Sequence, residues 1–229
     1  MLVTGIKSKP VYAPLQPDIR GRYHLMLGMG VGAGPLLRVI AEMQTAAPQA
    51  LKRARVLYIP EAADLGATSN HRATSNHRAT ANLPAASGHG AAPEIERFRA
   101  SVGDVQSFAD AAALLDRFRA ILGQSLMGTR LYVAGPESFI GLAMKIALEF
   151  NLNKDEIRAE ECGSLARRVY CIHCRATTEN VRTNIVRCVD CERWLLVRDH
   201  YSRRLAAYMG VMVDAEAPGE LPPVKEMFL

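Results

Sequence analysis

Four of the five cysteines in this chain form two C-x-x-C pairs, Cys171/Cys174 and Cys188/Cys191. Each C-x-x-C turn can present two thiolates on one small knuckle, and two such knuckles can place four soft ligands at the corners of a tetrahedron. The spacing is typical of a zinc ribbon whose coordination positions are all filled by protein. Such a site is structural, because it leaves no position for water or substrate. We therefore predict one structural zinc ion at these four cysteines.

The spacing of the cysteines predicts which residues bind the metal, but other features are needed to predict which metal they bind. A one-iron site of the rubredoxin type also uses four cysteines, but with Pro and Gly beside them, and the knuckles CIHCR and CVDCE contain neither. A [2Fe–2S] cluster has other typical spacings, so zinc is favoured over iron. His173, inside the first knuckle, is expected at the surface rather than as a ligand. The remaining cysteine, Cys162, is expected to be a small buried hydrophobe.

The ribbon around these cysteines should be built of short strands. The segment RATTENVRTNIVR between the two pairs predicts a hairpin, with TTEN (177–180) as its turn. The segment RWLLV (193–197) after the second pair predicts a further strand. We therefore predict a small module of strands that is stabilised by metal ligation.

Two glycine turns earlier in the chain are candidates for binding a nucleotide. Each follows a predicted strand and precedes a predicted helix, where backbone amides and a helix N-terminus can hold a phosphate. Glycines also permit any tight turn, so the pattern alone is weak. No acid, base or nucleophile constellation accompanies the turns, and we predict no catalytic residue. The candidate nucleotide-binding residues are Gly28, Gly30, Gly32, Gly34, Pro35, Gly135, Pro136 and Glu137.

The first two thirds of the chain alternate between strand and helix patterns. This alternation predicts an α/β fold with a doubly wound parallel five-stranded sheet, followed by the small zinc-ribbon domain. We place the α/β domain at 1–164, the ribbon at 165–212 and an extended C-terminal tail at 213–229. The predicted strands are 24–28, 54–60, 94–101, 129–135 and 156–160, and the predicted helices are 35–44, 104–122 and 136–150.

A polar segment at about 66–93 interrupts the α/β pattern. The unit ATSNHR occurs there twice in succession, from Ala67 and from Ala73. A tandem copy of a polar unit is typical of a loop that tolerates insertion. We predict a mobile surface insertion rather than a histidine metal site.

Composition narrows the class of protein. The chain has 229 residues, of which 49% are hydrophobic and 22% charged, enough for one core and a small satellite module. No apolar run is long enough to span a bilayer, and the N-terminus lacks the pattern of a secretory signal. Cysteines arranged as metal ligands favour a reducing compartment, so we expect a cytoplasmic protein. No membrane partner is expected.

The net charge of +5 is concentrated in the ribbon. Residues 165–204 contain nine arginines and four acidic residues, and 9 − 4 gives the whole excess. A basic ribbon raises the alternative of nucleic-acid binding. Few aromatic residues accompany these arginines, however, and arginine is equally common on protein-docking surfaces. We therefore expect no nucleic-acid partner.

The α/β part resembles the nucleotide-binding half of the ferredoxin-NADP reductase family. The resemblance rests on LMLGMGVGAGPLLRVI, LYVAGPESFIGLAMKIALEF and EIRAEECGS, over about residues 22–164. The G-x-G-x-x-P turn of that family is matched by Gly30, Gly32 and Pro35. Its later C-G-P turn is matched by Gly135 and Pro136. The resemblance implies the reductase topology and a place for NAD(P)H.

Departures from that family imply a lost activity. Ala134 stands where the family has a cysteine beside the nicotinamide, and Cys162 stands where its last strand has an aromatic residue. Only about twenty residues precede the first predicted strand, which leaves no room for the flavin-binding barrel. A hydride needs an acceptor held beside it. The chain is therefore expected to serve as a scaffold and not as a reductase by itself, and NAD(P)H binding by its glycine turns stays an open alternative.

The whole arrangement, continued through CIHC…CVDC…RDHYSRRLAAYMGV, resembles the DmmA subunit family of bacterial dimethylamine monooxygenases. The resemblance implies an accessory, non-haem subunit of a haem-dependent enzyme. That enzyme converts dimethylamine to methylamine and formaldehyde with NADPH and O₂. The implied partners are a haem-containing catalytic subunit and a flavin and iron–sulfur reductase subunit. The ribbon and the tail APGELPPVKEMFL are expected to clamp the chain to them.

Two other functions stay open at this point. The chain could be a stand-alone NAD(P)H-binding redox or sensor protein, in which case the isolated chain should bind a nicotinamide nucleotide. It could instead be a nucleic-acid-binding zinc ribbon, whose retention of DNA or RNA would fall steeply with salt.

Overall fold

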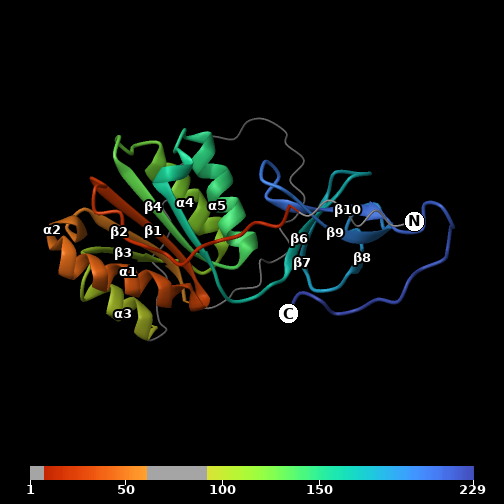
Figure 1. The fold of residues 1–229 in the computed structure, drawn as a ribbon, viewed down its shortest axis with the longest axis horizontal. Helices are drawn as coiled ribbons and strands as arrows, with labels where there is room; N and C mark the ends of the chain where they lie inside the picture. Colours follow the sequence, from red (N-terminus) through yellow and green to blue (C-terminus); the bar gives the residue numbers. More distant parts are fainter. Residues whose placement is uncertain (1–7, 61–91) are drawn as a thin grey trace.

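The computed structural model describes residues 8–60 and 92–229, so that most of the expected insertion at 66–93 lies outside the described residues. Two sheets lie side by side, a parallel sheet with helices and a smaller sheet formed by the C-terminal third of the chain (Figure 1). Among the helices of the described residues, none combines the length and apolar character that a bilayer crossing requires.

The first sheet has the predicted architecture. Its five strands are ordered β3-β2-β1-β4-β5, and each neighbouring pair is parallel. The central strands are buried on both faces, which explains why their sequences are continuous apolar runs. The parallel five-stranded sheet is thus confirmed. The strands are β1 (Tyr23–Met29), β2 (Ala54–Ile59), β3 (Asp104–Ser107), β4 (Thr129–Gly135) and β5 (Ile157–Glu161).

Helices cover both faces of this sheet, as a doubly wound fold requires (Figure 1). One apolar cluster lies between the sheet and α4 (Ala111–Leu122) with α5 (Glu137–Glu149). A second lies under α1 (Ala33–Ala46) and α3 (Pro93–Arg99) on the opposite face. The remaining short helices are η1 (Gly30–Gly32), α2 (Pro48–Leu51) and η2 (Lys154–Glu156).

Two predicted elements between β2 and α4 are wrong. Residues 94–101 were expected to be a strand but form most of helix α3, because Ile95 and Phe98 are spaced three apart and both are buried. The third strand is instead β3, in the segment expected to start a helix. Helix α4 begins only after Asp110, whose side chain accepts a hydrogen bond of 2.8 Å from the amide of Ala113.

The second sheet is the ribbon, with strand order β7-β6-β10-β9-β8. The hairpin expected between the two cysteine pairs is wrong, because the strands on either side, β7 and β8, lie at opposite edges of the sheet. Residues 177–180 belong to β7 and do not turn. Each C-x-x-C knuckle is instead the turn of its own hairpin, β6–β7 or β8–β9. The strands are β6 (Arg167–Cys171), β7 (Thr177–Val181), β8 (Ile185–Arg187), β9 (Trp194–Ser202) and β10 (Ala207–Met212).

The C-terminal tail folds back on the ribbon. The amide of Phe228 donates to the carbonyl of Arg182 at 3.0 Å, and the Phe228 ring is buried. The guanidinium of Arg167 lies between two rings, 3.8 Å from the centroid of Phe228 and 4.0 Å from that of Tyr208. Phe228 therefore packs within its own chain, whereas Leu221, Val224, Met227 and Leu229 of the tail are exposed apolar side chains.

The N-terminal segment 8–20 joins the two sheets without forming a strand or helix. The amide of Ser8 donates to the carbonyl of Asp199 in the ribbon at 2.9 Å. Further along, the amide of Leu15 donates to the Glu160 carboxylate of β5 at 2.6 Å. This segment therefore ties the edge of the parallel sheet to the ribbon.

Candidate functional site

The four predicted metal ligands come together at one end of the ribbon. The sulfur atoms of Cys171, Cys174, Cys188 and Cys191 all lie within 4.8 Å of one another. The Cys171 and Cys191 sulfurs are 3.8 Å apart, and those of Cys174 and Cys188 are 3.5 Å apart. A tetrahedron with metal–sulfur bonds of about 2.3 Å has edges of about 3.8 Å. The cluster therefore has the size and shape to hold one metal ion.

The surroundings of the thiols fit a structural site. Cys171 and Cys188 are buried and belong to the apolar cluster of the ribbon. A hydrogen bond from the backbone amide of Arg193 lowers the pKa of Cys191 to about 6, whereas burial raises the pKa of Cys174 to about 12. A bound cation would replace the protons that the buried thiols otherwise retain. The set can hold a metal by all four corners, leaving none for substrate.

His173 is not part of the ligand cluster. Its ring is exposed, with Nδ1 3.1 Å from a guanidinium nitrogen of Arg193. The same knuckle exposes Ile172, and the second knuckle exposes Val189. Apolar side chains at both knuckle tips give the metal end of the ribbon a surface suited to contact with another protein.

The two glycine turns meet at the carboxyl edge of the parallel sheet, between β1 and β4. This is the point where the strand order reverses, and it is where ligands bind in doubly wound sheets. Gly32 lies against β4 so closely that a Cβ there would be 2.2 Å from the carbonyl oxygen of Ala134. Gly30 has a φ of 55° and its carbonyl accepts a 2.7 Å hydrogen bond from Tyr58.

The other turn residues are divided between packing and open space. A Cβ at Gly28 would press against Leu36 and Tyr58, while one at Gly34 would meet nothing within 4 Å. Pro35 is buried in the first turn of α1, and Pro136 precedes the first residue of α5. Internal packing thus accounts for Gly28 and Gly32, and the positive φ accounts for Gly30, which weakens the glycine pattern as a sign of a nucleotide. Nucleotide binding by these turns, Gly135 included, stays a prediction.

Glu137 does not have the surroundings expected of a nucleotide ligand. It is only 4% exposed, and it lines a cavity of about 230 Å³ between the parallel sheet and the ribbon. A Cβ at Gly141 would lie 3.1 Å from a Glu137 oxygen and 2.2 Å from the Tyr201 hydroxyl, which places the two groups together. Burial raises the pKa of Glu137 to about 7. Sequence reasoning missed this contact between the two sheets, because its partners are distant in the chain.

The carboxylate of Glu137 lacks a hydrogen bond of good geometry within residues 8–60 and 92–229, as does the Tyr201 hydroxyl. A buried acid without such a partner is costly to ionise. It therefore favours the protonated form, in which it can donate. The titratable and charged groups that act on it are Tyr12 of the N-terminal segment, Glu161 of β5, Arg168 of β6 and Tyr201 of β9.

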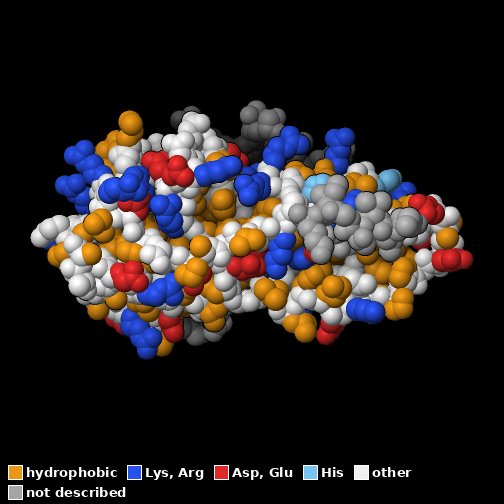
Figure 2. Space-filling model, viewed as in Figure 1, with side chains coloured by type: hydrophobic (Ala, Val, Ile, Leu, Met, Phe, Trp, Pro, Cys, Tyr) orange, Lys and Arg blue, Asp and Glu red, His pale blue; other side chains and the backbone are white. Residues whose placement is uncertain are grey.

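Several arginines of the ribbon are used within the chain. Arg167 pairs with Asp199 at 2.7 Å, and Arg168 pairs with Glu179 at 2.8 Å. Arg187 pairs with Glu192 at 2.8 Å. These pairs neutralise part of the basic excess, and the viewed face of the molecule carries both basic and acidic side chains (Figure 2). Both observations lower the expectation of a nucleic-acid surface.

Comparisons with known proteins identify relatives over both parts of the chain. The profile described as dimethylamine monooxygenase subunit DmmA-like, N-terminal domain, matches residues 4–83 and 71–157. The profile described as dimethylamine monooxygenase subunit DmmA-like, C-terminal domain, matches residues 168–211. The second match contains all four clustered cysteines.

A curated relative supports this assignment. The chain is 33% identical over 115 residues to the heme-dependent oxidative N-demethylase delta subunit of Ectopseudomonas mendocina (strain ymp). The aligned region covers 50% of this chain and 64% of the relative, so the chain spans somewhat under two thirds of that protein.

Solved reductases show a more distant likeness, and the family assignment does not depend on it. Phthalate dioxygenase reductase has a TM-score of 0.40 at 15% identity, over 76% of this chain and 46% of that one. The ferredoxin reductase of carbazole 1,9a-dioxygenase has a TM-score of 0.38 at 15% identity, over 66% of this chain and 34% of that one. The profile matches, which together cover most of the sequence, show that the chain belongs to the dimethylamine monooxygenase subunit DmmA-like family.

Proposed function

We propose that the chain is an accessory subunit of a haem-dependent oxidative N-demethylase that acts on dimethylamine. The reaction consumes NADPH and O₂ and gives methylamine and formaldehyde. In this proposal the haem lies on a catalytic subunit, and flavin and an iron–sulfur centre lie on a reductase subunit. The chain itself holds these partners in position for electron transfer.

One observation carries the proposal. Both parts of the chain, the α/β domain and the ribbon, match profiles of one family of monooxygenase subunits, and the relative from Ectopseudomonas mendocina is described as a demethylase delta subunit. A ribbon alone or a reductase-like sheet alone would fit many functions. The two in this order fit a dedicated subunit.

The geometry supports a scaffold more than a redox centre. The four thiolates could hold a metal ion with all four positions filled by protein, and we propose that this metal is one zinc ion. At the carboxyl edge of the sheet, Gly32 and Ala134 are in direct contact, and Glu137 is covered by the ribbon. The exposed Ile172 and Val189 at the knuckle tips, with Met227 and Leu229 of the tail, offer apolar contacts to partner chains. A cytoplasmic location is part of the proposal, because the thiols must stay reduced to bind metal.

Omission of single subunits tests this function. The genes that adjoin the one for this chain would be expressed with and without it, and dimethylamine-dependent oxidation of NADPH would be measured. We expect activity only when the chain is present, with the haem and flavin retained by the other subunits. Full activity without the chain would contradict the proposal.

Binding of NAD(P)H by the chain alone is the second candidate function. It is favoured by one observation, the open space around Gly34 at the start of α1. Titration of the purified chain with NADPH, followed by calorimetry, tests it. Saturable binding that is weakened by Gly34→Leu would favour a sensor or redox protein. Absence of binding would favour the scaffold role.

A further inference from the structure

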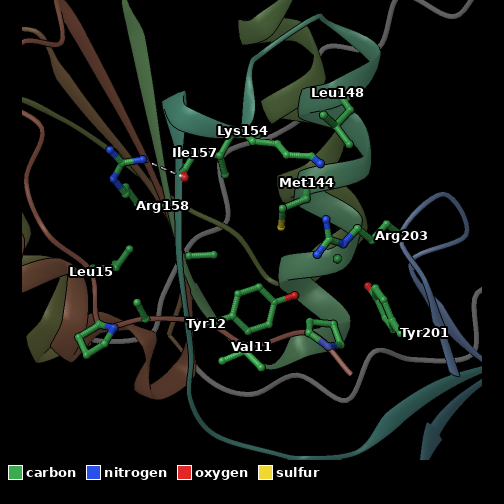
Figure 3. Close-up of a pocket in the computed structure, with 15 residues that line it drawn as sticks. Val11, Tyr12, Leu15, Met144, Leu148, Lys154, Ile157, Arg158, Tyr201 and Arg203 are labelled. Atoms are coloured by element: carbon green, nitrogen blue, oxygen red, sulfur yellow. Dashed lines mark hydrogen bonds between the residues drawn. The ribbon is translucent and has the colours of Figure 1, made fainter. Parts of the chain in front are cut away.

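We propose that a pocket between α5, β5 and the N-terminal segment receives an apolar and acidic polypeptide segment of a partner subunit. This α5–β5 pocket has a volume of about 290 Å³. It lies at the junction of the parallel sheet and the ribbon, because Tyr201 and Arg203 of the ribbon contribute to its wall (Figure 3). This inference rests on the proposed function, which supplies the partner.

The inner surface of the pocket is apolar. Met144 of α5 and Tyr12 of the N-terminal segment point into the space, and Ile157 forms part of the β5 wall (Figure 3). The apolar surface continues outward through Val11, which is 93% exposed, and Leu148, which is 43% exposed. Apolar side chains that are neither buried by the fold nor scattered singly are typical of a contact surface.

Two cationic side chains frame this apolar surface. Lys154 and Arg203 extend toward Met144 from different sides, whereas Arg158 points away (Figure 3). Arg158 is already used, with a guanidinium nitrogen 3.8 Å from the Asp18 carboxylate and another that donates to the Asp155 carbonyl. Within residues 8–60 and 92–229, neither Lys154 nor Arg203 has a carboxylate within ion-pair distance.

The charge of the lining selects the partner. Among the described residues that line the α5–β5 pocket, Lys154 and Arg203 are cations directed toward it and none is a carboxylate, so the pocket is complementary to an anion with an apolar body. An acidic residue next to a large apolar residue meets both requirements. The apolar side chain would lie on Met144 and Tyr12, and the carboxylate would reach Lys154 or Arg203.

The size of the pocket favours a polypeptide over a free small molecule. Pockets for drug-sized ligands enclose about 300–1,000 Å³ and cover most of the ligand. The α5–β5 pocket is at the lower limit of that range and is open along the side where Val11 and Leu148 are exposed. It is therefore better suited to one or two side chains of a docked chain, whose remaining surface would cover Val11 and Leu148.

A partner docked in the α5–β5 pocket would contact both parts of the chain. The α5–β5 pocket is walled by the parallel sheet, the N-terminal segment and the ribbon, so an occupant contacts all three. A partner bound there would hold the ribbon at a fixed position relative to the sheet. Such a contact would agree with the scaffold role proposed above.

Charge reversal tests the proposal in the assembled complex. The chain would be co-expressed with its partner subunits as wild type, as the double variant Lys154→Glu and Arg203→Glu, and as the double variant Lys52→Glu and Arg97→Glu. Both control residues are exposed and away from the pocket, since Lys52 directly follows α2 and Arg97 lies on α3, and their reversal changes the net charge by the same amount. We expect at least tenfold less partner recovered with the pocket variant and unchanged recovery with the control. Metal content and thermal unfolding of the purified chains report whether each variant is folded.

A cross-linking experiment locates the partner independently. A photoreactive aromatic amino acid would replace Val11 in one chain and Met127 in another, since these side chains are 93% and 95% exposed and differ mainly in position. Irradiation of the complex should join the partner to position 11 and not to position 127.

The outcomes separate this inference from the proposed function. If the wild-type chain recovers no haem-containing partner, the proposed function fails and the pocket inference fails with it. If the wild type recovers the partner and the pocket variant recovers it equally, the pocket inference is overturned while the proposed function stands. A third outcome would also overturn the proposal of a polypeptide occupant. In it, the purified wild-type chain releases a bound small molecule when it is denatured, and the pocket variant contains none.

Discussion

The parallel sheet and the ribbon of this chain are stabilised by different means. The sheet has an apolar cluster on each face, with central strands that are buried on both sides. The ribbon has one small cluster, and its cysteines belong to it. A sheet of this kind is held by burial of apolar area, whereas a small module with so few buried side chains depends on metal ligation. The difference indicates that one chain can contain two units with separate sources of stability, and it predicts that either unit can be unfolded while the other stays folded.

The largest expected effect is loss of the metal. Cys171→Ser, or removal of the metal with a chelator, should unfold the ribbon, because structural zinc contributes an apparent 10–16 kcal/mol in small zinc modules. The helices that pack on the parallel sheet should keep their circular dichroism signal. Metal analysis and thermal unfolding check this. Cys162→Ser is the control, since Cys162 lies outside the cluster and should leave the metal bound.

A core substitution in the parallel sheet should have the converse result. Phe118 of α4 is fully buried against the sheet, and Phe118→Ala should lower the free energy of unfolding by about 3–5 kcal/mol. The ribbon should still bind its metal in conditions where the sheet has unfolded. Loss of metal at the same denaturant concentration as loss of helix would show that the two units unfold together. That result would contradict separate sources of stability for the sheet and the ribbon.

The contact between the units should depend on pH through Glu137. Its pKa is raised from 4.5 to about 7, so the folded chain binds a proton more tightly than the unfolded chain. The free energy of unfolding should therefore fall as pH rises from about 4.5 to 7, by up to about 3 kcal/mol, and then stay low. Glu137→Gln should remove this dependence and be the more stable form at pH 8. Denaturant titrations at several pH values test this, with the exposed Glu42→Gln as a control that should keep the wild-type profile.

The smallest effects concern the glycine turn. Gly32→Ala should cost about 1–3 kcal/mol, because its Cβ would meet the backbone of Ala134. Gly34→Ala lies in α1 with open space around it and should stabilise by about 0.5–1 kcal/mol. Thermal unfolding of the two variants compares them directly. Equal effects would mean that close packing does not explain the glycines of this turn.

Local patterns in the sequence predict the features that depend on neighbouring residues. Central strands such as β1 are continuous apolar runs, and the ligand set is contained in two C-x-x-C turns, so both could be recognised. The strand expected at 94–101 was wrong because charged residues alternate there with apolar ones at a spacing that also fits a helix. Asp110 was the signal for the start of α4 that went unused.

Features that join distant parts of the chain could not be predicted in this way. The edge positions of β7 and β8 depend on which strands pair. The parallel pairing of β10 with β6 places β7 at one edge of the sheet and β8 at the other. The burial of Glu137 requires Tyr201, more than sixty residues later, and the α5–β5 pocket requires the N-terminal segment. These contacts follow from the docking of one unit on the other, for which no short motif exists.

The most direct test of the central claim is affinity purification of this chain, co-expressed with its genomic neighbours, followed by an absorption spectrum and metal analysis of the eluate. We predict a Soret band from a partner subunit in fixed ratio to this chain, together with one zinc per chain. A colourless eluate that contains this chain alone would contradict it.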